Sequence, residues 1–196
     1  SCTLVAAAGV NTVMNMGDTA DEIVAYAAAE DFASAYYKDL YDAGNVIALG
    51  MPVNYDSDEF AAGVVAGLTF LSEHEAPYLV HCTEGKDRAG FVSALLECLM
   101  GAALEEVIDD YMVTYYNYYG VEEGTEKYAA IVKNNLIKVL NTTFKVEDVY
   151  KADLAAEAEA FLMEDAGLTA NEVAALKGKL TISLQEIYDA CQTEAL

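Results

Sequence analysis

Strand-like and helical segments alternate along the first half of the chain, and this alternation restricts the fold more than any other feature. Short apolar runs at residues 11–15, 45–50 and 77–82 have the composition of buried strands. Helical spacing occurs between the second and third runs, at Phe60, Val64, Leu68 and Leu71. Strands that alternate with helices build a sheet covered by helices. We therefore predict an α/β fold with a central mixed or parallel sheet of about four strands flanked by helices.

The C-terminal half is predicted to be helical, because no convincing strand pattern follows Gly90. Glycines 101 and 120 mark the ends of two helices, and further helices are expected near residues 31–42 and 125–140. Capping-box pairs begin three more: Thr19 with Glu22, Thr169 with Glu172, and Ser183 with Glu186. The helix before Gly120 carries an apolar stripe that we interpret as core packing, formed by Val107, Ile108, Tyr111, Met112, Tyr115, Tyr116 and Tyr119.

The 196 residues suit one domain, which we expect to span residues 1–196. The first residues read as the interior of a domain, so we expect an N-terminal part to be missing. No signal peptide is visible in the chain, which leaves cytoplasmic and secreted locations open. The longest uncharged apolar stretch, Phe60 to Ser72, is too short to span a bilayer, so stable membrane insertion is not expected.

Charge and cysteine usage exclude several kinds of site. The net charge of −23 argues against nucleic acid and against anionic membrane surfaces, since both attract clustered Lys and Arg. Cys2, Cys82, Cys98 and Cys191 lie far apart without a CxxC pair, so neither a zinc site nor a dense disulfide framework is indicated. Cys98 lies on an apolar helical stretch and is expected in the core.

The segment HCTEGKDRAG, from His81 to Gly90, carries the chemistry. A strand delivers Cys82 to the carboxyl end of the sheet, and a helix begins near Arg88. Gly85 permits the tight curl between them, so the N–H groups of residues 83–88 and the helix N-terminus can form an anion cradle. Such a cradle favours the thiolate of Cys82, which can attack phosphorus in line. Arg88 can hold two phosphoryl oxygens through the transition state.

This segment resembles the signature loop of the protein tyrosine phosphatase superfamily, His-Cys, five residues, Arg. It is most similar to a bacterial tyrosine-phosphatase-like group whose loop contains Gly-Lys-Asp-Arg. The resemblance implies a phosphocysteine intermediate without metal or cofactor, Lys86 as a phosphate contact, and Asp87 as the general acid. The catalytic residues would be Cys82, Asp87 and Arg88. The phosphate-binding residues would be Thr83, Glu84, Gly85, Lys86, Asp87 and Arg88.

Other observations leave alternatives open. The rival general acids are Asp56 and Asp58, although acidic residues at a helix N-terminus are expected in any case. Ala89 stands where the family normally has Ser or Thr, which puts turnover in doubt but not phosphate binding. Asn15 and Gly17 stand where the group commonly has Asp and Arg, so a supporting charge network is absent or replaced. His81 is expected to orient the loop by hydrogen bonding.

Three functions are compatible with these sequence features. The leading hypothesis is a phosphatase that acts on phosphotyrosine in proteins. The second is a phosphatase of phosphoinositides or inositol phosphates, which Lys86 favours and the net acidity disfavours. The third is an inactive phosphate-binding relative, for which Ala89 is the support. The expected partner is therefore a phosphorylated protein or a small phosphate monoester.

Overall fold

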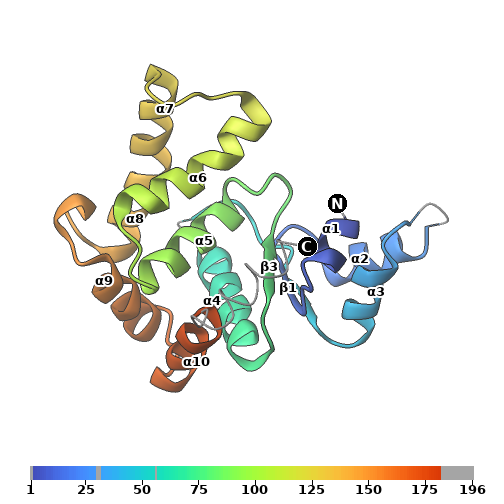
Figure 1. Cartoon of the computed structure of the whole chain (residues 1–196). Helices are drawn as coiled ribbons and strands as arrows, with labels where there is room; N and C mark the ends of the chain where they lie inside the picture. The colour runs from blue at the N-terminus through green and yellow to red at the C-terminus, as the bar shows by residue number, and fades with distance from the viewer. Residues whose placement is uncertain (1, 30–31, 56, 182–196) are drawn as a thin grey trace, which may run out of the picture.

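The computed structural model describes residues 2–29, 32–55 and 57–181. Its centre is a parallel sheet of three strands in the order β2-β1-β3 (Figure 1). The strands are β1 (Thr12–Asn15), β2 (Val46–Ala48) and β3 (Tyr78–His81). Val13 of β1 pairs with Val46 on one side and with Leu79 on the other. The α/β prediction is confirmed, with three described strands in place of about four.

Three short helices cover one side of the sheet: α1 (Cys2–Ala7), α2 (Ala20–Ala27) and α3 (Ala35–Asp42). A small apolar cluster joins them to the strands through Val10, Val13, Ile23, Leu40 and Val46. The predicted capping box begins α2, because Thr19 and Glu22 exchange hydrogen bonds. Helix α3 begins at Ala35 and not near Asp31, and residues 30–31 lie outside the described part.

The main core lies on the other side of the sheet. It is formed by α4 (Asp58–Glu73), α5 (Arg88–Leu99) and α6 (Leu104–Tyr119) against β1 and β3. Leu68 and Leu95 are fully buried there, and Cys98 is buried as predicted. Each fully buried leucine contributes about 1.5–3 kcal/mol to stability, so this layer holds α5 and the loop before it in place.

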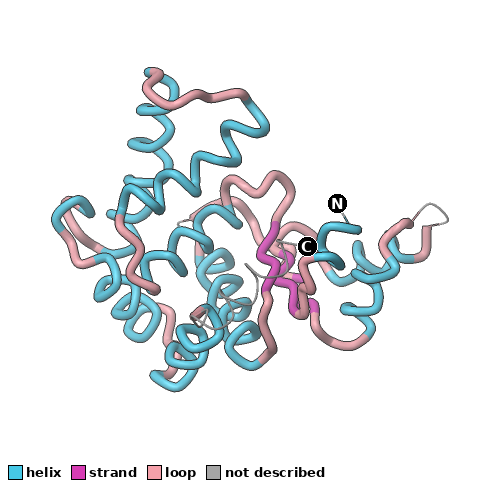
Figure 2. The backbone as a smooth tube through the Cα atoms, in the orientation of Figure 1, coloured by secondary structure: helices cyan, strands magenta, loops and turns pink. Residues whose placement is uncertain are grey.

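The rest of the described chain, up to residue 181, is mainly helical as predicted, and no described residue after His81 lies in a strand (Figure 2). Its elements are α7 (Glu126–Ile131), η1 (Val132–Ile137), α8 (Lys138–Phe144), η2 (Val149–Lys151), α9 (Leu154–Ala160), η3 (Phe161–Asp165) and α10 (Ala170–Leu180). The predicted helix 125–140 is α7, η1 and α8 in succession, with a π-type turn at η1. The Thr169–Glu172 capping box begins α10, while the Ser183–Glu186 pair lies outside the described residues.

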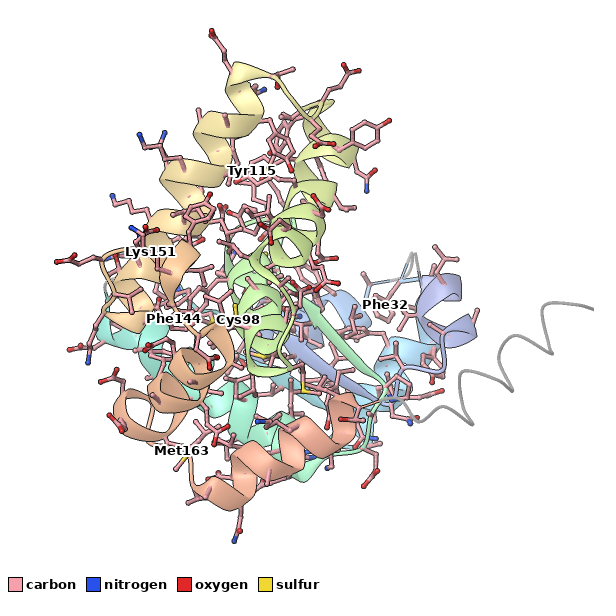
Figure 3. The ribbon with its side chains drawn as sticks, turned by 60° about the vertical axis from the view of Figure 1, so that its left-hand side comes forward. Phe32, Cys98, Tyr115, Phe144, Lys151 and Met163 are labelled. Carbon is pink, nitrogen blue, oxygen red and sulfur yellow. The ribbon has the colours of Figure 1, made fainter. Side chains whose placement is uncertain are left out.

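The tyrosine stripe on α6 is only partly a packing surface. Tyr111 and Tyr115 are buried, but Tyr116 and Tyr119 are 60% and 43% exposed. The prediction of core packing was therefore wrong for those two, because the last turn of α6 extends beyond the helices that cover its start. Figure 3 shows Cys98 and Phe144 in the packed interior and Lys151 at the periphery.

Candidate active site

The loop of residues 82–87 joins the end of β3 to the start of α5 at the carboxyl edge of the sheet (Figure 1). Its turn is made at Gly85, whose φ of 79° lies in the left-handed region that favours glycine. The local sequence therefore produces the predicted strand-loop-helix, and it places Cys82 directly after β3 and Arg88 at the first position of α5.

The backbone N–H groups of residues 83–87 donate to no acceptor in the described part of the chain. Asp87 is the N-cap residue of α5, and its side chain does not cap the helix. The loop amides and the helix N-terminus thus remain available to an anion from outside the protein. This is the arrangement that the anion-cradle hypothesis requires.

The Arg88 side chain is held by backbone groups that follow the other two strands. Its Nη1 donates to the carbonyl oxygens of Met16 and Met51, at 3.0 and 2.8 Å. Its Nη2 donates to Thr83 Oγ1 at 3.0 Å. The Nε atom is buried and has no partner among the described residues. An arginine has five N–H donors, so three are engaged and two remain, one on Nε and one on Nη2. Two such donors can hold two oxygens of one phosphoryl group.

Cys82 is a free, half-buried cysteine packed against the edge of the core. The segment after β1 supports its backbone: Met16 N–H donates to the His81 carbonyl at 2.9 Å. A Cβ on Gly17 would lie 3.4 Å from the Cys82 carbonyl carbon and from Thr83 N. Gly17 therefore permits close approach of the two backbones, a role that the sequence analysis missed.

A hydrogen-bond network centred on Asn15 occupies the region where the sequence indicated that a supporting charge network is absent or replaced. Asn15 Oδ1 accepts from the N–H groups of Gly17 and Asp18, and its Nδ2 donates to Asp18 Oδ2 and to the Tyr37 hydroxyl. The Tyr37 hydroxyl lies 3.4 Å from His81 Nε2. Burial lowers the pKa of His81, which favours the neutral ring. A hydrogen-bond network of Asn15, Asp18 and Tyr37 thus takes the place of the charge network and positions the start of the loop.

Glu84 and Lys86 pair across the outer surface of the loop. Lys86 Nζ lies 2.8 Å from Glu84 Oε2 and 3.7 Å from Asp87 Oδ2. Tyr119, from the last turn of α6, donates its hydroxyl to Glu84 Oε2 at 2.8 Å. The ion pair lowers the pKa of Glu84 and raises that of Lys86. The lysine side chain is therefore bonded to the loop's own carboxylate, a contact that sequence reasoning did not foresee.

Asp87 and its rivals occupy different environments. Asp87 is half-buried and faces a cavity of about 270 Å³ lined also by Tyr55, Asn134, Asn135, Lys138, Val139, Thr142 and Thr143. Asp58 is the exposed first residue of α4, beside the N-cap Ser57, whose hydroxyl accepts from Phe60 N–H. Asp58 thus has the ordinary role of an acidic residue at a helix N-terminus. Asp56 lies outside the described residues.

Ala89 is buried in the first turn of α5 and brings no hydroxyl group to the loop. Any hydrogen bond to the Cys82 sulfur must therefore come from a group other than this side chain.

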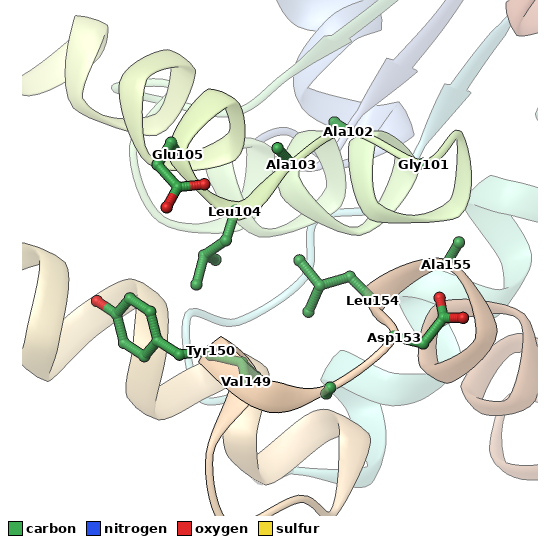
Figure 4. A pocket seen from close by; sticks show the side chains of 11 residues that line it. Gly101, Ala102, Ala103, Leu104, Glu105, Val149, Tyr150, Asp153, Leu154 and Ala155 are labelled. Carbon is green, nitrogen blue, oxygen red and sulfur yellow. The ribbon is translucent and has the colours of Figure 1, made fainter.

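Another cavity is remote from the loop (Figure 4). It measures about 350 Å³ and lies beyond the opposite end of α5, between the α5–α6 connection and the start of α9. Its charged side chains are Glu105 and Asp153, which would repel a phosphate. We therefore place the candidate site at the loop and not in this cavity.

The described residues contain neither a group of three His, Cys, Asp or Glu side chains suited to a metal nor a helix long and apolar enough to cross a membrane. A sequence model of the tyrosine phosphatase family matches residues 9–182. No curated protein matches the chain. The match covers both the sheet and the loop, and it extends through the helices that follow them.

Proposed function

Because this chain belongs to the tyrosine phosphatase family, we propose that it hydrolyses phosphotyrosine in proteins through a phosphocysteine formed on Cys82. The observation that carries the proposal is the arrangement of Arg88, whose two unengaged N–H donors sit beside a loop of unpaired backbone amides. Donors held ready for a phosphoryl group need no reorganisation as charge develops in the transition state, which is the main source of such catalysis.

In the first chemical step the Cys82 thiolate attacks phosphorus while the ester P–O bond breaks. Arg88 and the N–H groups of residues 83–87 hold the equatorial oxygens. Asp87 gives its proton to the departing oxygen, which leaves as an alcohol or phenol. The half-buried side chain of Asp87 faces the cavity that would receive this leaving group, whereas Asp58 is exposed at a helix start.

In the second step the Asp87 carboxylate takes a proton from water, and the resulting oxygen attacks phosphorus. The P–S bond breaks, Cys82 departs as a thiolate, and inorganic phosphate is released. Because Ala89 supplies no hydroxyl to the departing sulfur, we expect this step to be slow. The two steps together consume one water molecule for each ester hydrolysed, and neither step requires a metal or cofactor.

Phosphotyrosine is favoured as substrate by the cavity beside Asp87. Its lining residues include Tyr55, against which an aromatic leaving group can pack, and Asn134, whose exposed amide can bond peptide groups. The net charge of −23 disfavours highly anionic substrates and nucleic acid. The remaining candidate function is phosphate binding without turnover, and its supporting observation is Ala89.

The decisive experiment compares Cys82→Ser with Cys98→Ala. Cys98 is buried on α5 away from the loop, so its variant controls for loss of a thiol. The substrates are a phosphotyrosine peptide, a phosphoserine peptide and phosphoinositides. We expect Cys82→Ser to lose hydrolysis while keeping affinity for inorganic phosphate, and Cys98→Ala to keep turnover. Acid quenching of the wild type followed by mass spectrometry should recover phosphate on Cys82. Full activity of Cys82→Ser would refute the mechanism, and an inactive wild type that binds phosphate would establish the binding function.

A further inference from the structure

We infer that Glu84, Lys86 and Tyr119 form a charge-selective rim that admits esters with a single phosphate and excludes those with a second phosphate beside it. The inference rests on the proposed function and specifies the substrate class of the same site. It assigns the side chains of Glu84 and Tyr119 to the choice of substrate. The N–H groups of the loop backbone have the separate role of binding the reacting phosphate.

Contacts within the rim engage most of the hydrogen-bond donors of Lys86. Lys86 Nζ donates to Glu84 Oε2 at 2.8 Å and to the Tyr119 hydroxyl at 3.4 Å, and it lies 3.7 Å from Asp87 Oδ2. The same ammonium is 5.4 Å from the centre of the Tyr119 ring, within the range of a cation–π contact. An ammonium has three donors, and two of them are directed to groups of the protein.

Charge explains why this arrangement selects against a second phosphate. Within the rim Glu84 contributes one negative charge and Lys86 one positive charge, so its side chains sum to zero and offer a second phosphate no net attraction. A free lysine would attract another phosphate group, but here its charge is neutralised at 2.8 Å by Glu84. The Glu84 side chain is 44% exposed and meets the approaching substrate. A substrate with one phosphate can bind the loop without contacting the side chains of this rim.

Tyr119 holds the rim in place from a separate element. It lies in the last turn of α6, which ends at Gly120 with φ of 60°. Its ring lies 6.1 Å from that of Tyr115, which is buried. The hydroxyl group donates to the same Glu84 oxygen that receives the lysine. Glu84 is therefore positioned by α6 as well as by its own loop, and this contact gives the exposed Tyr119 side chain a partner.

The test measures how two anions compete with hydrolysis of p-nitrophenyl phosphate. The probes are inorganic phosphate and inositol 1,4,5-trisphosphate, and the result is the ratio of their inhibition constants. Glu84→Gln should shift this ratio about fivefold in favour of the trisphosphate, the size expected for one partly exposed charge. Tyr119→Phe keeps the ring but loses the hydroxyl, and it should shift the ratio in the same direction by about twofold, a share of the same charge effect.

Glu73→Gln is the matched control, because it removes one exposed carboxylate at the end of α4, beyond the amino end of β3. At physiological salt its charge is screened from the loop, so the ratio should remain that of the wild type. An unchanged ratio in Glu84→Gln, or an equal shift in Glu73→Gln, would overturn the inference while leaving the phosphatase function intact. If the wild type hydrolyses no ester, the proposed function fails, and calorimetric titration with the same two anions still tests the rim.

Discussion

Replacement of Arg88 tests the count of hydrogen-bond donors on which the proposed mechanism depends. Three of its five N–H groups are engaged by Met16 O, Met51 O and Thr83 Oγ1, and two are left for the phosphoryl group. Lysine has three N–H donors in all. If its ammonium continues to serve the two carbonyl oxygens, Arg88→Lys retains one donor for the substrate. Arg88→Met retains none.

The two variants should therefore form a graded series. A hydrogen bond to a charged group contributes roughly 1.5–3 kcal/mol, and about 1.36 kcal/mol corresponds to a factor of ten in rate. Loss of one such bond predicts that Arg88→Lys lowers kcat/KM by about one to two decades. Loss of both bonds predicts a fall of about two to four decades for Arg88→Met.

The assay is hydrolysis of p-nitrophenyl phosphate under conditions that give kcat/KM directly. Thermal unfolding midpoints of both variants reveal damage to the fold, since Met16 and Met51 lose a partner in Arg88→Met. Lys151→Met removes a cation that is 83% exposed on the surface and serves as the control. An Arg88→Lys enzyme within threefold of the wild type would refute the donor count, and so would equal losses in the two variants at equal stability.

Three further outcomes are expected. Asp87→Asn should slow esters with poor leaving groups by about 10²–10⁴ and spare p-nitrophenyl phosphate; rate comparison across leaving groups checks this, and the same pattern in Asp58→Asn would instead support that residue as the acid. Ala89→Ser should raise steady-state turnover by about one to two decades and shrink a pre-steady-state burst of product; a wild type without a burst would show that another donor serves the sulfur. Burial, with Asp110 and Glu106 nearby, raises the pKa of Glu97 to about 8 from 4.5. The folded state therefore holds this proton more tightly than the unfolded state, and the free energy of unfolding should fall as pH rises from the lower to the higher value. Urea unfolding across that range should show the fall in the wild type and a flatter profile in Glu97→Gln.

Local features of this protein could be predicted from sequence because they depend on short windows of chain. The cap of α2 at Thr19, the turn at Gly85 and the start of α5 each follow from residues within a few positions of one another. The candidate catalytic residues Cys82, Asp87 and Arg88 likewise belong to one loop. Backbone preference and hydrophobic period are local properties, so they indicated the strand-loop-helix and the chemistry that it can carry.

The partners of those residues could not be predicted in the same way. Arg88 bonds the carbonyl oxygens of Met16 and Met51, which are 72 and 37 positions away, and any residue type supplies a carbonyl. Tyr119 reaches Glu84 across 35 positions, and its place in the periodic stripe of α6 indicated packing in the core rather than this exposed contact. Such contacts arise only when packing of α6 and of the three strands brings distant segments together. The sequence by itself indicated which groups could bind a phosphate, because they lie in one short segment, and the tertiary structure decided which of their donors and charges are already engaged by distant parts of the chain.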